Sequence, residues 1–418
     1  MDYQKISGQG FNLHLIEKKL TKRNIVEIRL ADKIKYEDIT KRYFLNKYLI
    51  SITNNYPTER LLSIKTEDLY NVHLGSTIER IGNISLFVIG ISFLNERYTE
   101  KGMTDQTIKF LKEIVYNCNF NEEQFKVIKK RIIEEIKDEE ESKKYKATIS
   151  LKEAMDKNSP FAFRRVYLKQ LNSLTLKDIT DYYQQVISES DINIYAVGDF
   201  SFTAFSKKIL KNFSFPSKPK LFKNNCLIHN KFRLLSKKVM KKDKVNQSIL
   251  KIGFKLKDLN LFEQEYVMPI YNEILGGGSN SKLFNEVREK HSLAYYSSSL
   301  YSPYDNVLYI SSGISKENYR LTKKLISKII NDLQQGKFTE EDITSAKNNM
   351  INRFNMNRKE SSFLISRQVL KQYYKAKDID EVIKQIKKVT KKQIIDASKK
   401  IKLDTIYFLY GGESNETD

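Results

Sequence analysis

The sequence predicts an α+β protein built from two homologous domains, each an antiparallel sheet covered by helices. Three observations lead to this fold class. Apolar strand-like segments alternate with segments of helical spacing, two pairs of segments recur half a chain apart, and 418 residues exceed what one domain usually holds.

The strands are expected where apolar residues run continuously or alternate with polar ones. They are "SLFVIGISFL" at 85–94, "INIYAVGD" at 192–199 and "NVLYISSGIS" at 306–315. A hairpin is expected in "LYSPYDNVLYI", with its turn at 302–306. The segment 321–336 has helical spacing and should end at Gly336.

The first recurring pair consists of two amphipathic helices. "FNEEQFKVIKKRIIEEI" starts at 120 and "FTEEDITSAKNNMINRF" starts at 338. Each begins with a phenylalanine, an N-cap residue (Asn121 or Thr339) and two glutamates, which suit the positive end of a helix dipole.

The second recurring pair combines a helix with a strand. In 174–200 and 389–413, Thr175 or Thr390 can cap a helix that leads into an apolar strand. We therefore expect an N-terminal domain at 1–213 and a C-terminal domain at 245–418. Residues 214–244, with two prolines and many lysines, are expected to form a partly ordered linker.

The net charge of +22 is compatible with nucleic-acid binding. However, the lysines are interleaved with acidic residues in every segment, without an arginine-rich tract or an aromatic platform. A lysine-rich surface that favours acidic or extended peptides is the better interpretation. Nucleic-acid binding remains the less favoured alternative.

The cysteines and the apolar runs indicate a cytoplasmic protein. Cys118 and Cys226 lie far apart without CxxC spacing, which suits a reducing compartment. No apolar run reaches the length of a membrane span, and residues 1–20 contain no apolar signal core.

The most informative stretch is "YNEILGGGSNSKLFNEVREKHSLAYYSSS" at 271–299. Its glycine run, "LF", "REK" and "LAY" resemble the C-terminal signature of the M16 peptidase family, also called pitrilysin-like or inverzincin peptidases. The resemblance extends over nearly the whole chain and implies a LuxS/M16 metallohydrolase-like duplication. Within the family, an M16B-like chain of this length with a degenerate zinc motif is most like the bacterial YmfF-type members, which are paired with a YmfH-type sister chain.

The resemblance places an H-x-x-E-H zinc motif on a helix of the N-terminal half. Here the corresponding residues are "YFLNK", with Tyr43 and Lys47 at the histidine positions and Asn46 at the position of the general base. A lysine ammonium repels zinc, and an amide cannot shuttle a proton. Glu134 or Glu135 falls in the region of the distal ligand. We therefore expect no zinc and no cofactor in this chain, and no peptidase activity from it alone.

The C-terminal half keeps the other part of the machinery that the resemblance implies. The family places an arginine and a tyrosine seven residues apart, facing zinc across a chamber, and Arg288 and Tyr295 match them. Such groups can stabilise the negative charge that develops on the attacked carbonyl oxygen. Gly276, Gly277 and Gly278 lack a phosphate-loop pattern. They are expected either to lie beside bound peptide or to cap a helix.

The resulting hypothesis is a non-zinc subunit of a heterodimeric M16-type metallopeptidase. An H-x-x-E-H partner chain would carry the zinc, Arg288 and Tyr295 would act in trans, and the substrates would be peptides or small unfolded proteins. Two alternatives stay open. The chain could be a catalytically inert peptide-binding scaffold, or it could be a basic nucleic-acid-binding protein.

Overall fold

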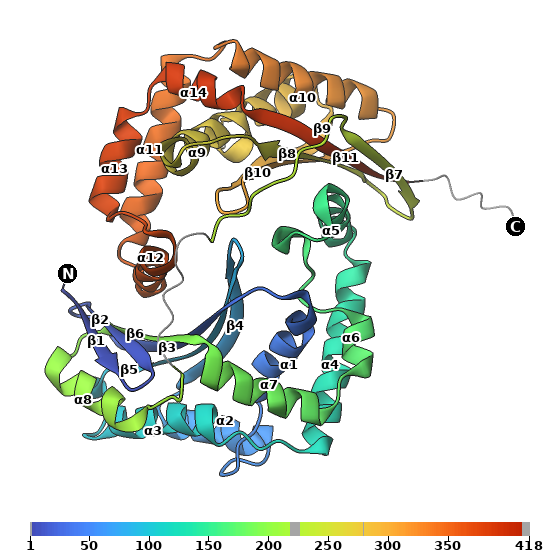
Figure 1. Cartoon of the computed structure of the whole chain (residues 1–418). Coiled ribbons are helices and arrows are strands. Elements are labelled where there is room, and N and C mark those ends of the chain that lie inside the picture. The colour runs from blue at the N-terminus through green and yellow to red at the C-terminus, as the bar shows by residue number, and fades with distance from the viewer. Residues whose placement is uncertain (1, 218–225, 279, 412–418) are drawn as a thin grey trace, which may run out of the picture. The chain divides into compact units, whose positions relative to one another are not determined.

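The computed structural model describes residues 2–217, 226–278 and 280–411, which divide into two compact units (Figure 1). The first unit contains Met1–Lys137, Arg164–Cys226 and Arg358–Ala376. The second contains Asp138–Phe163, Leu227–Asn357 and Lys377–Asp418. Each unit has one sheet with helices, so the α+β class is confirmed.

The sheet of the first unit has six strands in the order β1-β2-β6-β3-β5-β4. The strands are β1 (Tyr3–Gly8), β2 (Phe11–Glu17), β3 (Arg23–Lys33), β4 (His73–Ile81), β5 (Ile84–Leu94) and β6 (Asp191–Gly198). The predicted apolar strand at 85–94 is β5, and it is almost fully buried because it lies between β3 and β4 with helices on one face. The edge strand β4 is mostly half-buried or exposed.

The helices of the first unit bury one continuous apolar core against this sheet. They are α1 (Ile39–Leu49), α2 (Glu59–Asp68), α3 (Met103–Tyr116), α4 (Glu122–Glu141), α6 (Leu168–Ser173), α7 (Leu176–Glu189), α8 (Phe202–Asn212) and α12 (Ser361–Tyr374), with short 3-10 turns at Tyr36–Asp38 and Glu96–Tyr98. Helix α4 belongs to the first unit as far as Lys137, and its last residues belong to the second. The predicted cap of α7 is confirmed, since Thr175 and Asp178 form a capping box.

The sheet of the second unit has five strands in the order β7-β11-β8-β10-β9. The strands are β7 (Lys237–Asp243), β8 (Ser248–Leu256), β9 (Ala294–Ser302), β10 (Val307–Ile314) and β11 (Ile401–Gly411). The predicted hairpin is β9–β10, in which Ser302 pairs with Val307. Because β7 lies inside the predicted linker, that segment is ordered in part; residues 218–225 of it lie outside the described residues.

The helices of the second unit cover both faces of its sheet (Figure 1). They are α5 (Lys143–Asp156), η3 (Pro160–Ala162), η4 (Glu263–Val267), α9 (Met268–Asn272), η5 (Glu273–Gly277), η6 (Leu283–Lys290), α10 (Tyr319–Gln334), α11 (Glu340–Asn357), α13 (Ile379–Lys388) and α14 (Lys391–Ser398). The segments η4, α9 and η5 follow one another without a break. The predicted cap at Thr390 is also a capping box, formed with Gln393.

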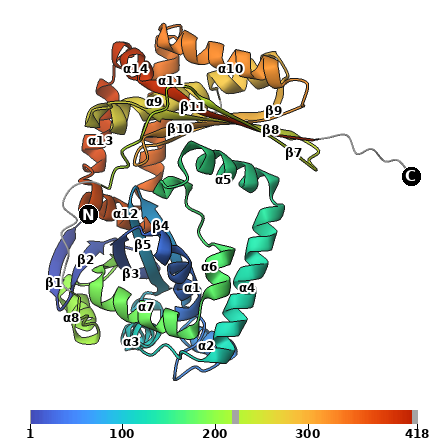
Figure 2. The same ribbon diagram turned by 45° about the vertical axis from the view of Figure 1, so that its right-hand side comes forward.

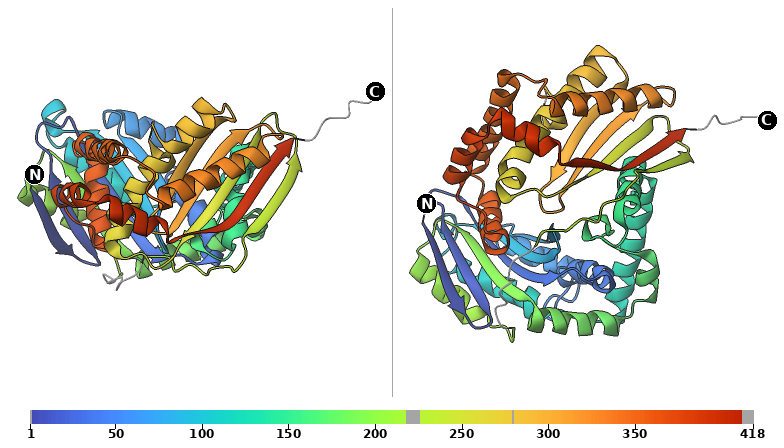
Figure 3. Two further views of the ribbon diagram at one scale, coloured as in Figure 1. Left: turned by 90° about the horizontal axis from the view of Figure 1, so that it is seen from above. Right: turned by 45° about the horizontal axis from the view of Figure 1, so that its top comes forward.

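The two sheets share one strand order once β1 is set aside: β2-β6-β3-β5-β4 matches β7-β11-β8-β10-β9. Both depart in one respect from the expected antiparallel sheet, because β2–β6 and β7–β11 pair in parallel. Figure 3 shows β7 and β11 side by side. Strand β6 lies between β2 and β3, and β11 lies between β7 and β8. The two flanking strands run in opposite directions in each case, so the inserted strand must be parallel to one of them.

One helix of each half belongs to the unit formed mainly by the other half. Helix α5 lies beside the second sheet (Figure 2) and packs Ala147, Leu151 and Met155 on it. Helix α12 contacts β6 of the first sheet. Tyr373 on α12 donates a hydrogen bond to Asp191 at 2.8 Å. The compact units therefore exchange segments and differ from the consecutive ranges 1–213 and 245–418.

Candidate functional site

Helix α1 presents the degenerate motif to helix α4. Tyr43 and Lys47 are four residues apart and so lie on the same helical face. The Tyr43 hydroxyl donates to Oε2 of Glu135 at 2.6 Å, and Lys47 Nζ donates to Oε1 at 2.9 Å. The structure thus brings Tyr43, Lys47 and Glu135 into contact. Of the two glutamates considered from the sequence, Glu135 faces α1, whereas Glu134 is exposed.

Both carboxylate oxygens of Glu135 are engaged, which determines its charge. Burial acts to raise the pKa of Glu135, but the hydrogen bonds from Tyr43 and Lys47 outweigh it, and the pKa is lowered. Arg165 adds to this effect and lies 5.2 Å from the centre of the Tyr43 ring. Glu135 therefore stays ionised and is surrounded by cations and a hydroxyl donor.

These residues do not fit a zinc ion. The two histidine positions carry an ammonium and a phenol, and the one carboxylate already binds both. A zinc ion there would meet the positive charges of Lys47 and Arg165. Among the described residues, no three His, Cys, Asp or Glu side chains are grouped so that they could hold a metal ion.

The histidines do not form a replacement metal site within the ranges that the structure describes. His14 is buried on β2 and shares hydrogen bonds with Tyr3 at 2.8 Å and with Asn193 at 3.0 Å. Burial lowers the pKa of His14 to about 4, so it is neutral at pH 7. His73 is exposed at the start of β4, and His291 lies 4.0 Å from Glu286.

Asn46, which the resemblance assigns to the position of the general base, links α1 to the edge strand β4. Its side-chain amide donates to the backbone carbonyl of Thr77 at 3.2 Å. The Ser76 hydroxyl donates to the backbone carbonyl of Asn46 at 2.8 Å and lies 3.2 Å from Oδ1. The residue is buried, so its contacts are structural.

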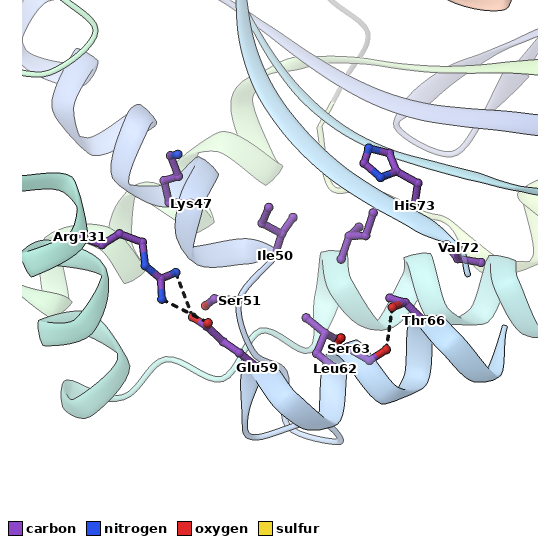
Figure 4. A pocket seen from close by; sticks show the side chains of 11 residues that line it. Lys47, Ile50, Ser51, Glu59, Leu62, Ser63, Thr66, Val72, His73 and Arg131 are labelled. Carbon is purple, nitrogen blue, oxygen red and sulfur yellow. Dashed lines mark hydrogen bonds and ion pairs between the residues drawn. The ribbon is translucent and has the colours of Figure 1, made fainter. Parts of the chain in front are cut away.

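A pocket of about 490 Å³ opens beside Lys47 (Figure 4). Its charged lining residues are Lys47, Glu59 and Arg131, and Arg131 binds Glu59 at 3.1 and 3.2 Å. His73 and Leu74 of β4 form another part of the wall. The pocket lies within the first unit, between the end of α1, α2, α4 and the edge strand.

The second unit repeats this arrangement with the charges exchanged. Arg353 on α11 binds Glu273 on η5 at 2.6 and 3.1 Å, as Glu135 on α4 binds Lys47 on α1. Phe120 and Phe338 open the equivalent helices, and fifteen residues after each stand Glu135 and Arg353. The repeat offset was the signal that could have identified this second pair in the sequence.

The hydrogen bonds to the edge strand are repeated as well. Ser299 on β9 donates to Oδ1 of Asn272 at 2.8 Å and lies 3.3 Å from its backbone carbonyl. Asn272 and Asn46 each immediately precede the charged residue of their pair. The degenerate motif thus has the same structural links as a helix that carries no zinc motif.

Arg288 and Tyr295 both lie near the edge of the second sheet. Arg288 is on η6, where its guanidinium stacks on Phe284 at 4.9 Å and lies 3.6 Å from Glu289. Tyr295 is 79% exposed. Across β9–β10, Gly313 pairs with Tyr296 and Ile314 with Ala294, so Tyr295 is the extra residue of a β-bulge.

The glycine run ends a helix and packs against β9. Gly276 and Gly277 are the last residues of η5, and Gly278 is extended, with a φ of −100°. A Cβ on Gly276 would lie 2.6 Å from both Leu283 Cδ1 and the Ser299 backbone nitrogen. This close approach accounts for glycine at 276 without a ligand; binding of peptide by the three glycines stays a prediction.

The fold agrees with comparisons to known proteins. The family model described as "Peptidase M16 inactive domain" matches residues 173–350. A crystal structure of a conserved protein from Enterococcus faecalis V583 superposes with a TM-score of 0.92 at 24% identity, covering 100% of both chains. A protease from Helicobacter pylori superposes with a TM-score of 0.81 at 15% identity, covering 98% of this chain and 99% of that one. The chain is therefore similar to members of the M16 peptidase family over residues 173–350.

The chain is also similar to proteins that are named as inactive or as non-peptidases. It is 25% identical to the "Probable inactive metalloprotease YmfF" of Bacillus subtilis over 416 residues, which cover 97% of this chain and 96% of YmfF. It is 24% identical to the "Non-peptidase homolog YmxG" of Helicobacter pylori over 255 residues, 59% of this chain and 57% of that protein.

Proposed function

We propose that this chain is the non-zinc subunit of a two-chain M16-type metallopeptidase that processes or degrades peptides. A partner chain with an intact H-x-x-E-H motif supplies zinc and the general base. This chain supplies Arg288 and Tyr295 to that site.

The engagement of Glu135 by Tyr43 and Lys47 carries the first part of the proposal. Both oxygens that could bind metal accept hydrogen bonds, and Lys47 already provides the positive charge. The similarity to proteins named as inactive supports the same conclusion.

The placement of Arg288 and Tyr295 supports the second part. A β-bulge turns a side chain away from the regular alternation of its strand, and bulges are frequent next to active sites. Here the bulge residue is Tyr295, and its phenol is largely exposed. The Arg288 side chain is 47% exposed, so both can reach groups of another chain.

The test uses the chain reconstituted with an H-x-x-E-H sister chain. Arg288→Ala should lower kcat for a fluorogenic peptide about 100-fold, the typical effect of removing one group that stabilises a developing oxyanion. Arg320→Ala removes an exposed arginine from α10 of the same unit and should leave kcat unchanged. Normal turnover by the Arg288 variant in a normally assembled pair would refute the role in trans.

Metal analysis tests the other part of the proposal. The purified chain should contain far less than one zinc per molecule, measured by plasma mass spectrometry. Stoichiometric zinc in the isolated chain would contradict the assignment of the metal to the partner.

An inert peptide-binding scaffold is the second candidate. It is favoured by the Arg288 guanidinium, which already stacks on Phe284 and lies near Glu289 of the same helix. Unchanged turnover of the Arg288→Ala pair, with peptide binding retained, would select this alternative.

We also propose a cytoplasmic location. Cys118 and Cys226 are buried free thiols, and burial raises the pKa of Cys226 to about 11. Such protonated thiols suit a reducing compartment. In the described ranges, the structure contains no helix that combines the length and the apolar character needed to cross a bilayer.

A further inference from the structure

Two leucines project from the second unit just before the edge strand β7. Leu234 is fully exposed and Leu235 is 85% exposed, while Phe232 and Met240 beside them are 42% and 45% exposed. Single exposed apolar residues are common on protein surfaces, but several in one short stretch mark an interaction surface. We call residues 231–242, which contain these side chains, the basic edge segment.

Contacts on both sides hold the two leucines in place. The Arg233 guanidinium donates to two backbone carbonyls at the end of α5, at 2.8 and 2.9 Å. Lys255 donates to the backbone carbonyl of Lys231 at 2.9 Å, and from Lys237 onward the segment is paired with β11. The fold therefore sets the exposure of the two leucines, which do not lie on a loose end of the chain.

The basic edge segment carries positive charge and no negative charge. Its five lysines are all exposed, and it contains no acidic residue; the lysines are Lys231, Lys237, Lys238, Lys241 and Lys242. The acidic residue that follows, Asp243, already accepts from Lys143 and Lys146 of α5 at 2.9 and 3.0 Å. The segment therefore attracts an anionic surface.

The position of β7 lets the lysines of both sheet faces reach one surface. In the described ranges, β7 is an edge strand, with β11 on one side only. Val239 packs toward α5 on one face, and Lys238 Nζ lies 5.4 Å from the centre of the Tyr319 ring of α10 on the other. Lysine stems are long and flexible, so ammonium groups from both faces can bend toward a flat surface that approaches the edge.

Lysines on an edge strand also prevent it from pairing with another sheet. That role explains the charges of β7 but not the leucines before it, because exposed leucines increase the risk of aggregation. A partner that is anionic at its surface and apolar beneath it explains both features.

We propose that the basic edge segment binds the surface of an anionic lipid bilayer. Leu234 and Leu235 enter the boundary between headgroups and acyl chains, and the lysines lie at the anionic headgroups. Apolar burial and attraction to anionic lipids act together in such peripheral binding, and neither is strong alone. This binding goes beyond the proposed function and does not depend on it.

The side chains of the segment favour a bilayer over a nucleic acid. Nucleic-acid sites commonly use arginine forks and aromatic platforms. Here Arg233 donates to backbone carbonyls of its own chain, and the two most exposed apolar side chains are aliphatic. A bilayer has an apolar interior that can take up two leucines, whereas a nucleic acid offers base faces and phosphates.

The experiment measures sedimentation of the purified full chain with lipid vesicles. One set is pure phosphatidylcholine, and in the other about one lipid in three is phosphatidylserine. The partition coefficient should be at least about tenfold higher with the anionic vesicles and should fall as salt is added. Leu234→Ser/Leu235→Ser and Lys241→Gln/Lys242→Gln should each lower it about tenfold.

Matched control variants separate this surface from general effects. Leu20→Ser/Leu300→Ser removes two exposed leucines elsewhere, one of them on β9 at the opposite edge of the same sheet. Lys207→Gln/Lys211→Gln removes two exposed lysines from α8 and changes the net charge equally. Both controls should partition within about twofold of the wild type. Equal losses in the segment variants and the controls would overturn the proposal.

A fluorescence measurement tests insertion without relying on the serine variant. The chain contains no tryptophan, so Leu234→Trp introduces a single probe. Its emission should shift to shorter wavelength with anionic vesicles and be quenched by brominated lipids, whereas Leu20→Trp should not change. Unshifted emission at 234 would refute insertion. Duplex DNA that binds the chain, with Leu234→Ser/Leu235→Ser as tightly as the wild type and without vesicle binding, would replace the bilayer by a nucleic acid.

Discussion

The helix of the degenerate motif and its counterpart in the second unit use the same links with opposite charges. Lys47 of α1 binds Glu135 of α4, whereas Glu273 of η5 binds Arg353 of α11. In each unit the preceding asparagine bonds a serine of the edge strand, Ser76 or Ser299. The first unit differs in two ways: Tyr43 also donates a hydrogen bond to Glu135, and a pocket lies beside Lys47.

Tyr43 and Lys47, which the resemblance assigns to the zinc motif, thus form a structural contact with Glu135. The ion pair of the first unit is partly exposed on both sides, while Glu273 of the second unit is buried and Arg353 is largely exposed. The first pair thus retains an accessible position between two helices. Three experiments test how far the two pairs are equivalent.

The largest effect is expected when zinc ligands are restored. In the double variant Tyr43→His/Lys47→His, two imidazoles would join Glu135 on the face where all three side chains already meet. The variant should bind about one zinc per chain, whereas the wild type should bind none under the same conditions. Plasma mass spectrometry after dialysis against zinc provides the measurement.

Adding Glu135→Ala to this double variant is the control for the third ligand. The triple variant should lose the metal. Retention of one zinc without Glu135, or no zinc in the double variant, would show that the positions do not retain the geometry of a metal site.

A charge exchange should have an intermediate effect. Glu135→Arg alone sets a third cation beside Lys47 and Arg165 and should destabilise the chain by about 2–3 kcal/mol. The double variant Lys47→Glu/Glu135→Arg copies the charge order of the second unit. Its free energy of unfolding should return to within about 1 kcal/mol of the wild type. Calorimetric melting of all four members of the cycle gives the coupling.

Equal destabilisation by the double variant and by Glu135→Arg would contradict the equivalence of the two pairs. The exposed change Glu134→Arg on the same helix is the matched control. It should stay within about 0.5 kcal/mol of the wild type.

The smallest effect is a difference in acid stability. Because the pKa of Glu135 is lowered in the folded chain, its contribution is present above the unfolded pKa and is lost as pH falls through the folded pKa. Glu135→Gln should therefore be less stable at pH 7, by under about 1 kcal/mol because the pair is partly exposed. The two proteins should converge near pH 3, and a constant difference between pH 7 and pH 3 would argue against this role.

Features set by local sequence were predictable. The caps at Thr175 and Thr390, the turn between Ser302 and Val307 and the buried strand β5 depend on neighbouring residues, so their patterns are visible in the chain. The absence of zinc ligands at 43 and 47 could be recognised for the same reason.

Features that depend on distant contacts were not predictable. Whether Glu134 or Glu135 faces Lys47 depends on how α4 is rotated against α1. Lys47 and Glu135 are 88 residues apart in the sequence, so this rotation is not visible in the local pattern. The parallel pairing of β2 with β6 joins residues about 180 positions apart.

The exchange of α5 and α12 constrains the order in which the chain can fold during its synthesis. The first unit includes Arg358–Ala376, so it lacks α12 until nearly the whole chain has left the ribosome. The contacts of Tyr373 with Asp191 and Asn193 must then form last on that sheet. Cutting the gene at residues 214–244 would leave each product with a sheet face uncovered and with a helix that has lost its sheet.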